Sequence, residues 1–516
     1  MIAWDIHIMT IKTPPSPYGS RIKPRSLDRW LPITSILIAA TVLFTYQLEG
    51  EGLWLDELTS IQDADQGLLA AYRENQLRPL YYFLLMFWMR FGSSDAWLRS
   101  LSVIFAIVSV FLIYRLGRRL SGEAEGLMAA LLLTVSPLFI NHAQEIRMYV
   151  LSLCLGLAGT LFLTDALLTE RPQRPSQRAL AGWSLFRLLA IYTVPLNVTL
   201  LLPDVLIICL RFRRERAVLF SFGKWLLLLI VLWSPSILSV VQESSPSSNF
   251  AAHHSDAAPP GLGRLIRPLK FFTVWPFEAQ ENAIAALFYK VFTLLLSGLI
   301  GAALIGKHKS PALLWVTAWF ILPLLPIVVF SYISTPIWVN RYLLFVIPYL
   351  FILLAAGFTR LWRQWKIAAV VMGIAYLIAA GGGLVHYYTV QERPDYKFNI
   401  ATIEQYEQPG DAIVWGYHYL KPLNRYYDGD MDVQWRPTYD IKTPADMQQW
   451  ISQMPAGYDR WWLVIDYTAP IEAEFESALA QSYTVEKTFD YERGSQVMLL
   501  SPLEVLPVRP SALPKP

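Results

Sequence analysis

Long apolar segments dominate the hydrophobic pattern of this sequence, and the polar residues gather in connections between them. A membrane-spanning helix needs about 20 mostly apolar residues. On this criterion we predict about eleven spans, which cover residues 30–48, 101–116, 126–140, 148–168, 183–194, 196–210, 217–241, 283–305, 312–331, 342–358 and 367–387. The pattern therefore predicts an α-helical polytopic membrane protein.

The apolar segment 79–91 is too short to cross a bilayer comfortably and is rich in aromatic residues, which is typical of an interfacial or re-entrant helix. If it lies along the outer surface, every strongly basic connection falls on one side of the membrane, and the positive-inside rule makes that side cytoplasmic. These connections are the N-terminal tail 1–29, Arg115, Arg118 and Arg119, Arg171, Arg174 and Arg178, the segment 211–216, Lys307 and Lys309, and Arg360, Arg363 and Lys366. The N-terminus is then cytoplasmic and the C-terminus external.

The pattern changes after Val390, where the chain becomes more polar. Strand-like runs occupy 411–417 and 460–467, a helical pattern covers 472–481, and a last strand is predicted at 496–500. The predicted organisation is a cytoplasmic tail at 1–29, a transmembrane domain at 30–389 whose first external loop 49–100 carries interfacial helices, a small external α/β domain at 390–503, and a disordered proline-rich tail at 504–516. A second long external loop is predicted at 242–282.

Composition narrows the class of protein further. Hydrophobic residues make up 54% of the chain and charged residues 16%, and the mean hydropathy is +0.37, which excludes an ordinary soluble enzyme. The net charge of +3 arises from separated clusters, so no nucleic-acid partner is predicted. Both cysteines, Cys154 and Cys209, lie inside apolar segments, which predicts neither a disulfide nor a thiolate metal site.

Two adjacent acids, Asp56 and Glu57, follow the first predicted span within the segment EGLWLDELTS. Acidic residues in the first turn of a helix complement its dipole, so both are candidates for the start of a helix at 58–72. The alternative is a carboxylate held at the outer membrane surface as a general base for a substrate presented there. Position alone leaves both interpretations open.

A second polar segment, NHAQEIRMY, connects two apolar helices at the predicted outer surface. Glu145 and Arg147 leave almost no room for a loop, so both charges are expected at or slightly inside the interface, where charged side chains favour a functional role. A local ion pair between them, or an Arg147 side chain reaching the headgroups, would also explain them. Asp204, within a predicted span, is interpreted as an internal polar contact.

Arg341 begins a span from the outer side and is an exception to the positive-inside pattern. An anionic partner would explain it, and a phosphate suits a guanidinium because the two can form a bidentate contact. An arginine that reaches the headgroups remains the alternative. The sequence contains no HExxH, P-loop or GxSxG motif, and it assigns no metal; whether a divalent cation is required stays open.

The order of these features has a known parallel. WLDELTS lies in an outward loop, RPLYYFLLMFWMRFG follows at the interface, and YRLGRRLSG, QEIRMYVLSL and NRYLLFVIPYLFILLAAG come in turn. The chain resembles the membrane glycosyltransferases of the C-type (GT-C) fold, in the family 39-like branch related to protein O-mannosyltransferases and the lipid A aminoarabinose transferase. The resemblance covers roughly residues 30–390 and is strongest before residue 170. In IYTVPLN, Val194 stands where many relatives carry a histidine, so any role of that histidine is absent or moved.

The resemblance implies an active site on the external face and an inverting transfer of a sugar from a polyprenyl phosphate lipid. Asp56 matches the first-loop acid of the family, which makes it the implied catalytic base or the acid that orients the acceptor, with Glu57 in support. Glu145 matches a second acid that helps to arrange the site, and Arg147 and Arg341, together with Tyr149, are candidates for binding the donor phosphate. The predicted catalytic set is Asp56, Glu57 and Glu145.

A donor activated by its phosphate ester requires no nucleotide site or glycine-rich loop, so no cofactor is predicted. The acceptor is left open as a lipid, a protein or a glycan, and the expected location is the inner or plasma membrane of a bacterium. The main alternative is a transporter or flippase of lipid-linked saccharides, which would place its charges near the middle of the membrane and show paired repeats. A structural membrane subunit would leave Asp56 and Glu145 without a role.

Overall fold

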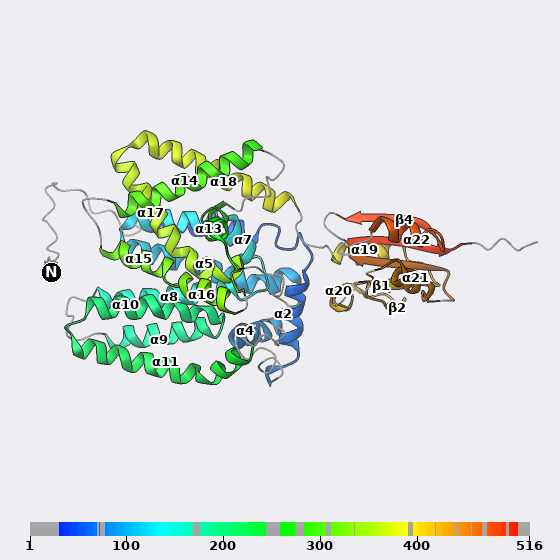
Figure 1. Cartoon of the computed structure of the whole chain (residues 1–516), viewed down its shortest axis with the longest axis horizontal. Helices are drawn as coiled ribbons and strands as arrows, with labels where there is room; N and C mark the ends of the chain where they lie inside the picture. Colours follow the sequence, from blue (N-terminus) through cyan, green and yellow to red (C-terminus); the bar gives the residue numbers. More distant parts are fainter. Residues whose placement is uncertain are drawn as a thin grey trace, which may run out of the picture.

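A helical bundle carries a unit built on a β-sheet at one of its ends (Figure 1). The computed structural model describes residues 30–69, 72, 78–168, 176–243, 259–274, 283–305, 311–334, 336–390, 396–417, 419–438, 441, 443–455, 457–466, 472–491 and 495–503. The predicted tails at 1–29 and 504–516 and much of the loop at 242–282 lie outside the described residues, and the domain boundaries stay predictions.

Helices occupy all the segments that hydropathy selected, in several places as two helices in succession. The bundle contains α1 (Leu31–Thr45), α5 (Asp95–Leu120), α6 (Glu123–Thr134), α7 (Pro137–Ala143), α8 (Tyr149–Leu167), α9 (Gln177–Ile191), η2 (Pro195–Leu200), α10 (Leu201–Arg211), α11 (Arg216–Glu243), α13 (Leu262–Val274), α14 (Ala283–Leu304), α15 (Pro311–Ile321), α16 (Leu324–Ile333), η4 (Asn340–Val346), α17 (Ile347–Gln364) and α18 (Lys366–Thr389). Among the described residues, 7 helices are long and apolar enough to span a membrane, or up to 8 if one bent pair is counted. The predicted α-helical membrane class is confirmed, whereas the count of about eleven spans stays a prediction.

Small residues and a proline explain how the helices around α6 pack. A Cβ at Gly117 would lie 3.0 Å from the Cα of Gly126, so α5 and α6 approach each other more closely than larger residues would allow. The pair α6 and α7 then bends by 65°. Pro137 is at the start of α7, where its missing N–H costs no helical hydrogen bond, and the Ser136 hydroxyl accepts a bond from the Phe139 N–H.

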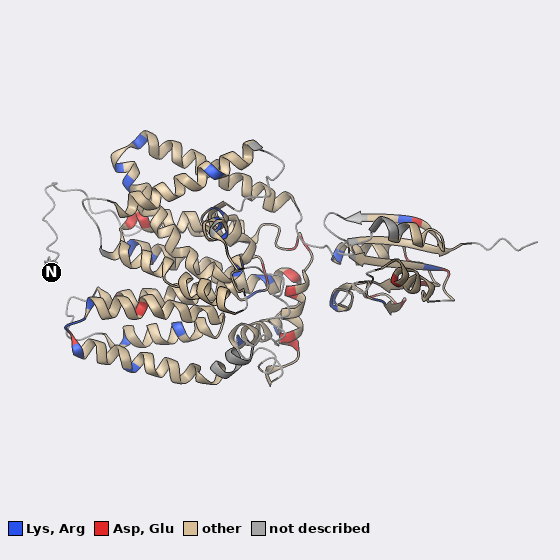
Figure 2. Cartoon of the chain, in the orientation of Figure 1, with Lys and Arg blue, Asp and Glu red and all other residues tan. Residues whose placement is uncertain are grey.

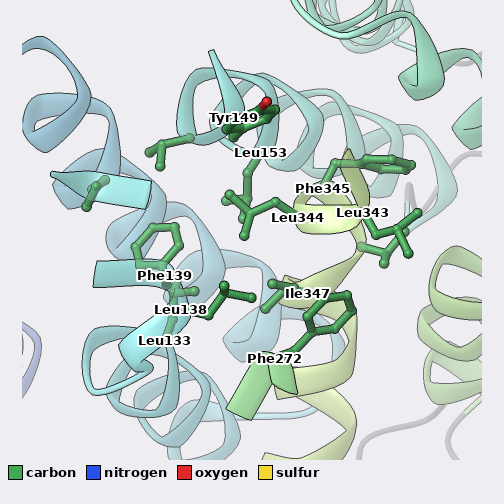
Figure 3. Close-up of a cluster of buried hydrophobic side chains, with 14 of the residues drawn as sticks. Leu133, Leu138, Phe139, Tyr149, Leu153, Phe272, Leu343, Leu344, Phe345 and Ile347 are labelled. Atoms are coloured by element: carbon green, nitrogen blue, oxygen red, sulfur yellow. The ribbon is translucent and has the colours of Figure 1, made fainter. Parts of the chain in front are cut away.

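The bend brings α7 against the centre of the bundle. Figure 3 shows apolar side chains from α6, α7, α8, α13 and the η4–α17 segment gathered around it. Phe139 and Phe272 are completely buried there, as are Leu133 and Ile347. Removing apolar surface from contact with lipid gains little, so dense packing of this kind is what holds such helices together.

Two helices of the first loop cover the end of the bundle that faces the sheet. These are α2 (Leu55–Asp65) and α4 (Pro79–Met89), which pack against each other. α4 has only 11 residues, in agreement with the predicted short segment. Figure 2 shows that the acidic positions of α2 lie at this end, while basic positions lie in the α10–α11 and α17–α18 turns at the opposite end.

The C-terminal unit contains a five-stranded sheet of order β2-β1-β3-β5-β4. Its elements are α19 (Tyr396–Tyr406), β1 (Asp411–Trp415), α20 (Lys421–Tyr426), β2 (Asp432–Trp435), α21 (Pro444–Ser452), β3 (Arg460–Asp466), α22 (Glu472–Leu479), β4 (Tyr483–Tyr491) and β5 (Ser495–Pro502). β1 pairs in parallel with β2 and β3, whereas β5 runs antiparallel to β3 and β4. The predicted α/β character is confirmed, and α20 packs on α2 of the helical bundle.

Candidate active site

Glu57 fixes the beginning of α2. Its carboxylate accepts a hydrogen bond from the backbone N–H of Trp54 at 3.3 Å, which is the capping arrangement expected at the third residue of a helix. Arg99 of α5 binds both carboxylate oxygens, at 3.1 and 2.9 Å, and the side chain of Glu57 is fully buried. The helix-start interpretation therefore holds for Glu57, although the helix begins at Leu55 and not at residue 58 as predicted. Its partner Arg99 was not predicted.

Arg99 also binds the chain that leads from α1 to α2. Its Nη1 donates to the carbonyls of Leu48 and Glu51, and its Nη2 donates to the carbonyl of Gly52 at 3.1 Å. One buried guanidinium thus satisfies the backbone of an irregular segment and neutralises Glu57. The start of α2 is rigidly attached to α5 as a result.

The segment between α7 and α8 is irregular but buried, so its backbone needs polar partners. The N–H of Ile146 donates to Glu57 at 2.9 Å, and the hydroxyl of Ser102 donates to the carbonyl of Glu145 at 2.6 Å. The amide nitrogen of Gln144 donates to the carbonyls of Phe44 and Tyr46 at the end of α1. Glu57 consequently connects the two polar segments that the sequence singled out.

Glu145 faces into this segment. Asn141 donates to one of its carboxylate oxygens at 3.0 Å, and the Nδ1 atom of His142 lies 2.7 Å from the other. Only 4% of the Glu145 side chain is exposed. The structure therefore places the predicted acid beside His142, which the sequence did not mark, whereas Arg147 turns toward α2.

Asp56 lies beside both predicted arginines. One carboxylate oxygen is 3.5 Å from Nη2 of Arg147 and 3.4 Å from Nη1 of Arg341, and 29% of the Asp56 side chain is exposed. These separations exceed the usual 2.7–3.2 Å of an N–H···O hydrogen bond. Residues from α2, the α7–α8 segment and η4 thus meet at one exposed carboxylate.

Arg147 is anchored to α2 by its other nitrogen. Its Nη1 donates to the Asp56 carbonyl and to the Ser60 hydroxyl, both at 3.0 Å. Burial lowers the pKa of Arg147, but Tyr149, Tyr82 and Asp56 raise it, and the resulting pKa stands well above the usual value. The guanidinium therefore remains a fixed positive charge.

Aromatic rings surround the two arginines. The guanidinium of Arg147 lies 5.7 Å from the ring of Tyr149, and that of Arg341 lies 5.5 Å from the ring of Tyr342 and 6.0 Å from that of Trp54. Such contacts favour a cation over the ring face. The Nε atoms of Arg147 and Arg341 are both buried and have no hydrogen-bond partner. The cluster therefore retains donor capacity that the protein itself does not use.

Arg78 also belongs to this cluster and was missed at the level of sequence. It is half-buried, and the groups that act on it electrostatically are Tyr82, Arg147, Tyr149 and Tyr342. It immediately precedes Pro79 at the start of α4. Its place in the RPLYYF motif, at the N-terminal end of the predicted interfacial helix, was the available signal.

Asp204 lies in a separate cluster inside the bundle. It pairs with Arg187, and both side chains are fully buried. The indole N–H groups of Trp183 and Trp319 donate to its two oxygens at 2.7 and 2.8 Å. The predicted internal polar contact is thus found. Across the described ranges, no group of three or more His, Cys, Asp or Glu side chains is arranged to hold a metal ion.

Comparison with known proteins identifies this arrangement of helices. Residues 78–238 match the family described as dolichyl-phosphate-mannose-protein mannosyltransferase. No curated protein matches the chain. The matched residues include α4, α5 and the α7–α8 segment, so they contain Arg78, Glu145 and Arg147 but neither Asp56 nor Arg341.

Solved structures share the fold over nearly the whole chain. ArnT from Cupriavidus metallidurans bound to undecaprenyl phosphate is 14% identical, with a TM-score of 0.53 over 91% of this chain and 98% of ArnT. Its apo state gives a TM-score of 0.55 over 92% of this chain and 98% of ArnT, again at 14% identity. The arabinofuranosyltransferase AftD from Mycobacteria is 14% identical, with a TM-score of 0.50 over 92% of this chain and 41% of AftD.

These comparisons confirm the resemblance seen in the sequence motifs. The chain has the fold of the C-type glycosyltransferases, and its apolar helices mark it as an integral membrane protein. The family match and the fold together indicate glycosyltransferase activity.

Proposed function

We propose that this chain, which has the fold of the C-type glycosyltransferases, transfers a sugar from a polyprenyl phosphate donor to an acceptor at the external membrane surface, with inversion. The observation that carries the proposal is the partly exposed carboxylate of Asp56 between the guanidinium groups of Arg147 and Arg341. A base and two phosphate-binding cations are thereby present within one cluster.

Asp56 is the proposed general base. The acceptor hydroxyl gives its proton to the carboxylate while its oxygen attacks the anomeric carbon from the side opposite the phosphate. The bond between that carbon and the phosphate oxygen breaks with its electron pair, so the lipid phosphate leaves and the anomeric centre inverts. General-base assistance contributes about 100- to 10,000-fold to such a step.

The arginines of the cluster suit the leaving phosphate. Negative charge develops on the lipid phosphate as the bond breaks, and preorganised cations stabilise it most strongly where water is excluded. Arg147 and Arg341 carry buried Nε–H donors without partners, and Arg78 lies in the same cluster. The undecaprenyl phosphate in the ArnT structure supports a lipid phosphate as the ligand.

Glu57 and Glu145 support this site through contacts with other protein groups. The oxygens of each carboxylate are occupied by protein donors or by His142, and neither side chain has appreciable exposed surface. We therefore assign both to positioning: Glu57 holds the first turn of α2, and Glu145 shapes the segment that carries Arg147. Of the three acids predicted to be catalytic, only Asp56 is proposed to contact the substrate.

The deciding experiment uses the purified, folded protein in lipid and measures sugar transfer from a polyprenyl phosphate sugar to candidate lipid, peptide and glycan acceptors. Asp56→Asn should reduce transfer by about 100- to 10,000-fold, while Asp65→Asn at the end of the same helix should leave it unchanged. Full turnover in Asp56→Asn would refute the base role. Movement of the intact donor across vesicles without sugar transfer would favour the transporter instead.

A further inference from the structure

A short helix of the C-terminal unit touches the segment that carries the proposed base. The Nζ atom of Lys421, the first residue of α20, donates to the hydroxyl of Thr59 at 3.0 Å. Thr59 is one turn beyond Asp56 on α2, and the two helices pack directly on each other. The C-terminal unit therefore reaches the catalytic helix itself and not only the loop around it.

Tyr426 makes the central contact of this interface. Its hydroxyl accepts a hydrogen bond from the backbone N–H of Leu53 at 2.8 Å and donates to the carboxylate of Asp95 at 2.8 Å. Burial and the neighbouring Asp95 raise the pKa of Tyr426 well above its usual value, so the hydroxyl keeps its proton. Arg425 donates to the other oxygen of Asp95 at 2.9 Å.

Both partners of Tyr426, Leu53 and Asp95, lie close to residues that fix the start of α2. Leu53 immediately precedes Trp54, the N-cap residue of α2. Asp95 is the first residue of α5, one turn before Arg99, which binds Glu57 in the first turn of α2. Arg99 thus holds the first turn of α2 through Glu57, and Tyr426 holds the residue just before the N-cap of α2.

We propose that Tyr426 is a positioning residue that makes sugar transfer depend on the docked C-terminal unit. Its hydroxyl joins the entry to α2 with the start of α5, and Lys421 holds α2 one turn further along. When α20 is docked, these contacts fix the Asp56 carboxylate relative to Arg147 and Arg341. The inference rests on the proposed function, because it assigns the consequence of docking to the base of that reaction.

The test compares two adjacent tyrosines. Tyr426→Phe keeps the ring and removes the hydroxyl that contacts Leu53 and Asp95. Tyr427→Phe is the matched control, because its hydroxyl bonds Met431 and Glu407 within the C-terminal unit. We expect Tyr426→Phe to lower kcat about tenfold with KM for the donor unchanged, since small displacements of a catalytic group cost on the order of 10 to 100-fold. Tyr427→Phe should leave kcat at the wild-type value.

Hydrogen exchange of the peptide around Leu53 provides a readout that does not require turnover. Tyr426→Phe removes the acceptor of the Leu53 N–H, and the loss of that neutral hydrogen bond should speed exchange there about 2- to 10-fold. Tyr427→Phe should not change exchange there. Lys421→Met, which loses the Thr59 hydrogen bond and the cation–π contact with Tyr419 but leaves both Tyr426 bonds, should shift exchange in α2 in the same direction by less. It serves as the second variant if Tyr426→Phe does not fold.

Faster exchange at Leu53 together with a lower kcat and an unchanged KM would support the proposal. Unchanged exchange, or faster exchange with wild-type kcat, would overturn it. If the wild-type protein transfers no sugar, the proposed function fails, whereas the exchange measurement still decides whether α20 holds the start of α2. The two failures are therefore distinguishable.

Discussion

Asp204 and Asp56 both lie beside arginines, and their surroundings differ sharply. Asp204 and Arg187 are fully buried, their closest atoms lie 2.7 Å apart, and two indole groups complete the hydrogen bonds of the carboxylate. Asp56 keeps 29% of its side chain exposed, its arginines stand 3.4 and 3.5 Å away, and two arginine Nε atoms lack partners. One cluster is complete without a ligand, and the other is not.

The difference separates a charge cluster whose hydrogen bonds the protein itself completes from one that keeps unused donors. A buried ion pair is tolerated only where both ions find partners within the protein, and Arg187 does so through Asp204, the Gly156 carbonyl and the Thr160 hydroxyl. A site for an anionic substrate must instead keep donor capacity in reserve. The cluster at Asp56 meets that condition.

Asp204→Asn should have the largest effect on stability. Removing one partner of a buried pair leaves the other charge uncompensated, which costs about 3–5 kcal/mol. Thermal unfolding in detergent should report this loss for Asp204→Asn, while Asp56→Asn should cost only about 0–1 kcal/mol, as is usual for ion pairs that solvent screens. Similar losses of stability in both variants would remove the distinction between the clusters.

Glu57→Gln should lower both stability and turnover. A glutamine amide would face the donors of Arg99 and Trp54 with its own N–H groups, so we expect about 3 kcal/mol of destabilisation. Transfer should fall as well, because α2 and the Ile146 segment lose their common anchor. Asp65→Asn is the control on the same helix. Wild-type stability with abolished transfer would show that Glu57 contacts the substrate.

Arg341→Lys should weaken the donor complex. Lysine keeps the charge but loses the planar pair of donors that matches a phosphate, and we expect KM for the polyprenyl phosphate sugar to rise about tenfold. The matched control is Arg363→Lys. Arg363 lies in the last turn of α17, is 70% exposed and pairs with Glu125. An unchanged KM, with kcat alone reduced, would mean that Arg341 orients Asp56 and does not bind the ground-state donor.

Hydropathy located the helical segments because each must present about 20 apolar residues to lipid. It missed α13, whose arginines and lysine interrupt the apolar run, and it missed α19, α20, α21, β2 and β4 in the polar C-terminal region. Strands at 411–415 and 460–466 were found because they are apolar on both faces of a mixed sheet. Short amphipathic elements carry too weak a pattern to be recognised without their neighbours.

The site was predictable where a charge contradicted its surroundings. Asp56, Glu145, Arg147 and Arg341 all stood out because charged residues beside apolar spans need a reason. Arg99 did not stand out, because an arginine at the start of a span is usually interpreted as an interfacial anchor. Glu57 is buried and Asp56 is partly exposed because Glu57 binds Arg99, which is 42 residues further along the chain. A local sequence pattern does not contain that information.

Tyr387→Phe should have the smallest effect and tests how firmly the exposed cluster is held. The Tyr387 hydroxyl of α18 donates to Gln144 at 2.7 Å, and Gln144 begins the segment that carries Arg147. Losing one neutral hydrogen bond should cost about 0.5–1.5 kcal/mol in thermal unfolding, with the exposed Tyr46→Phe as the control. Because Arg147 is also anchored directly to α2 through Ser60, transfer should decrease less than twofold. A loss of transfer as large as that of Glu57→Gln would mean that the α7–α8 segment, and not α2, sets the distance between Asp56 and Arg147, and the rigid element of the site would then be the one that carries the cation.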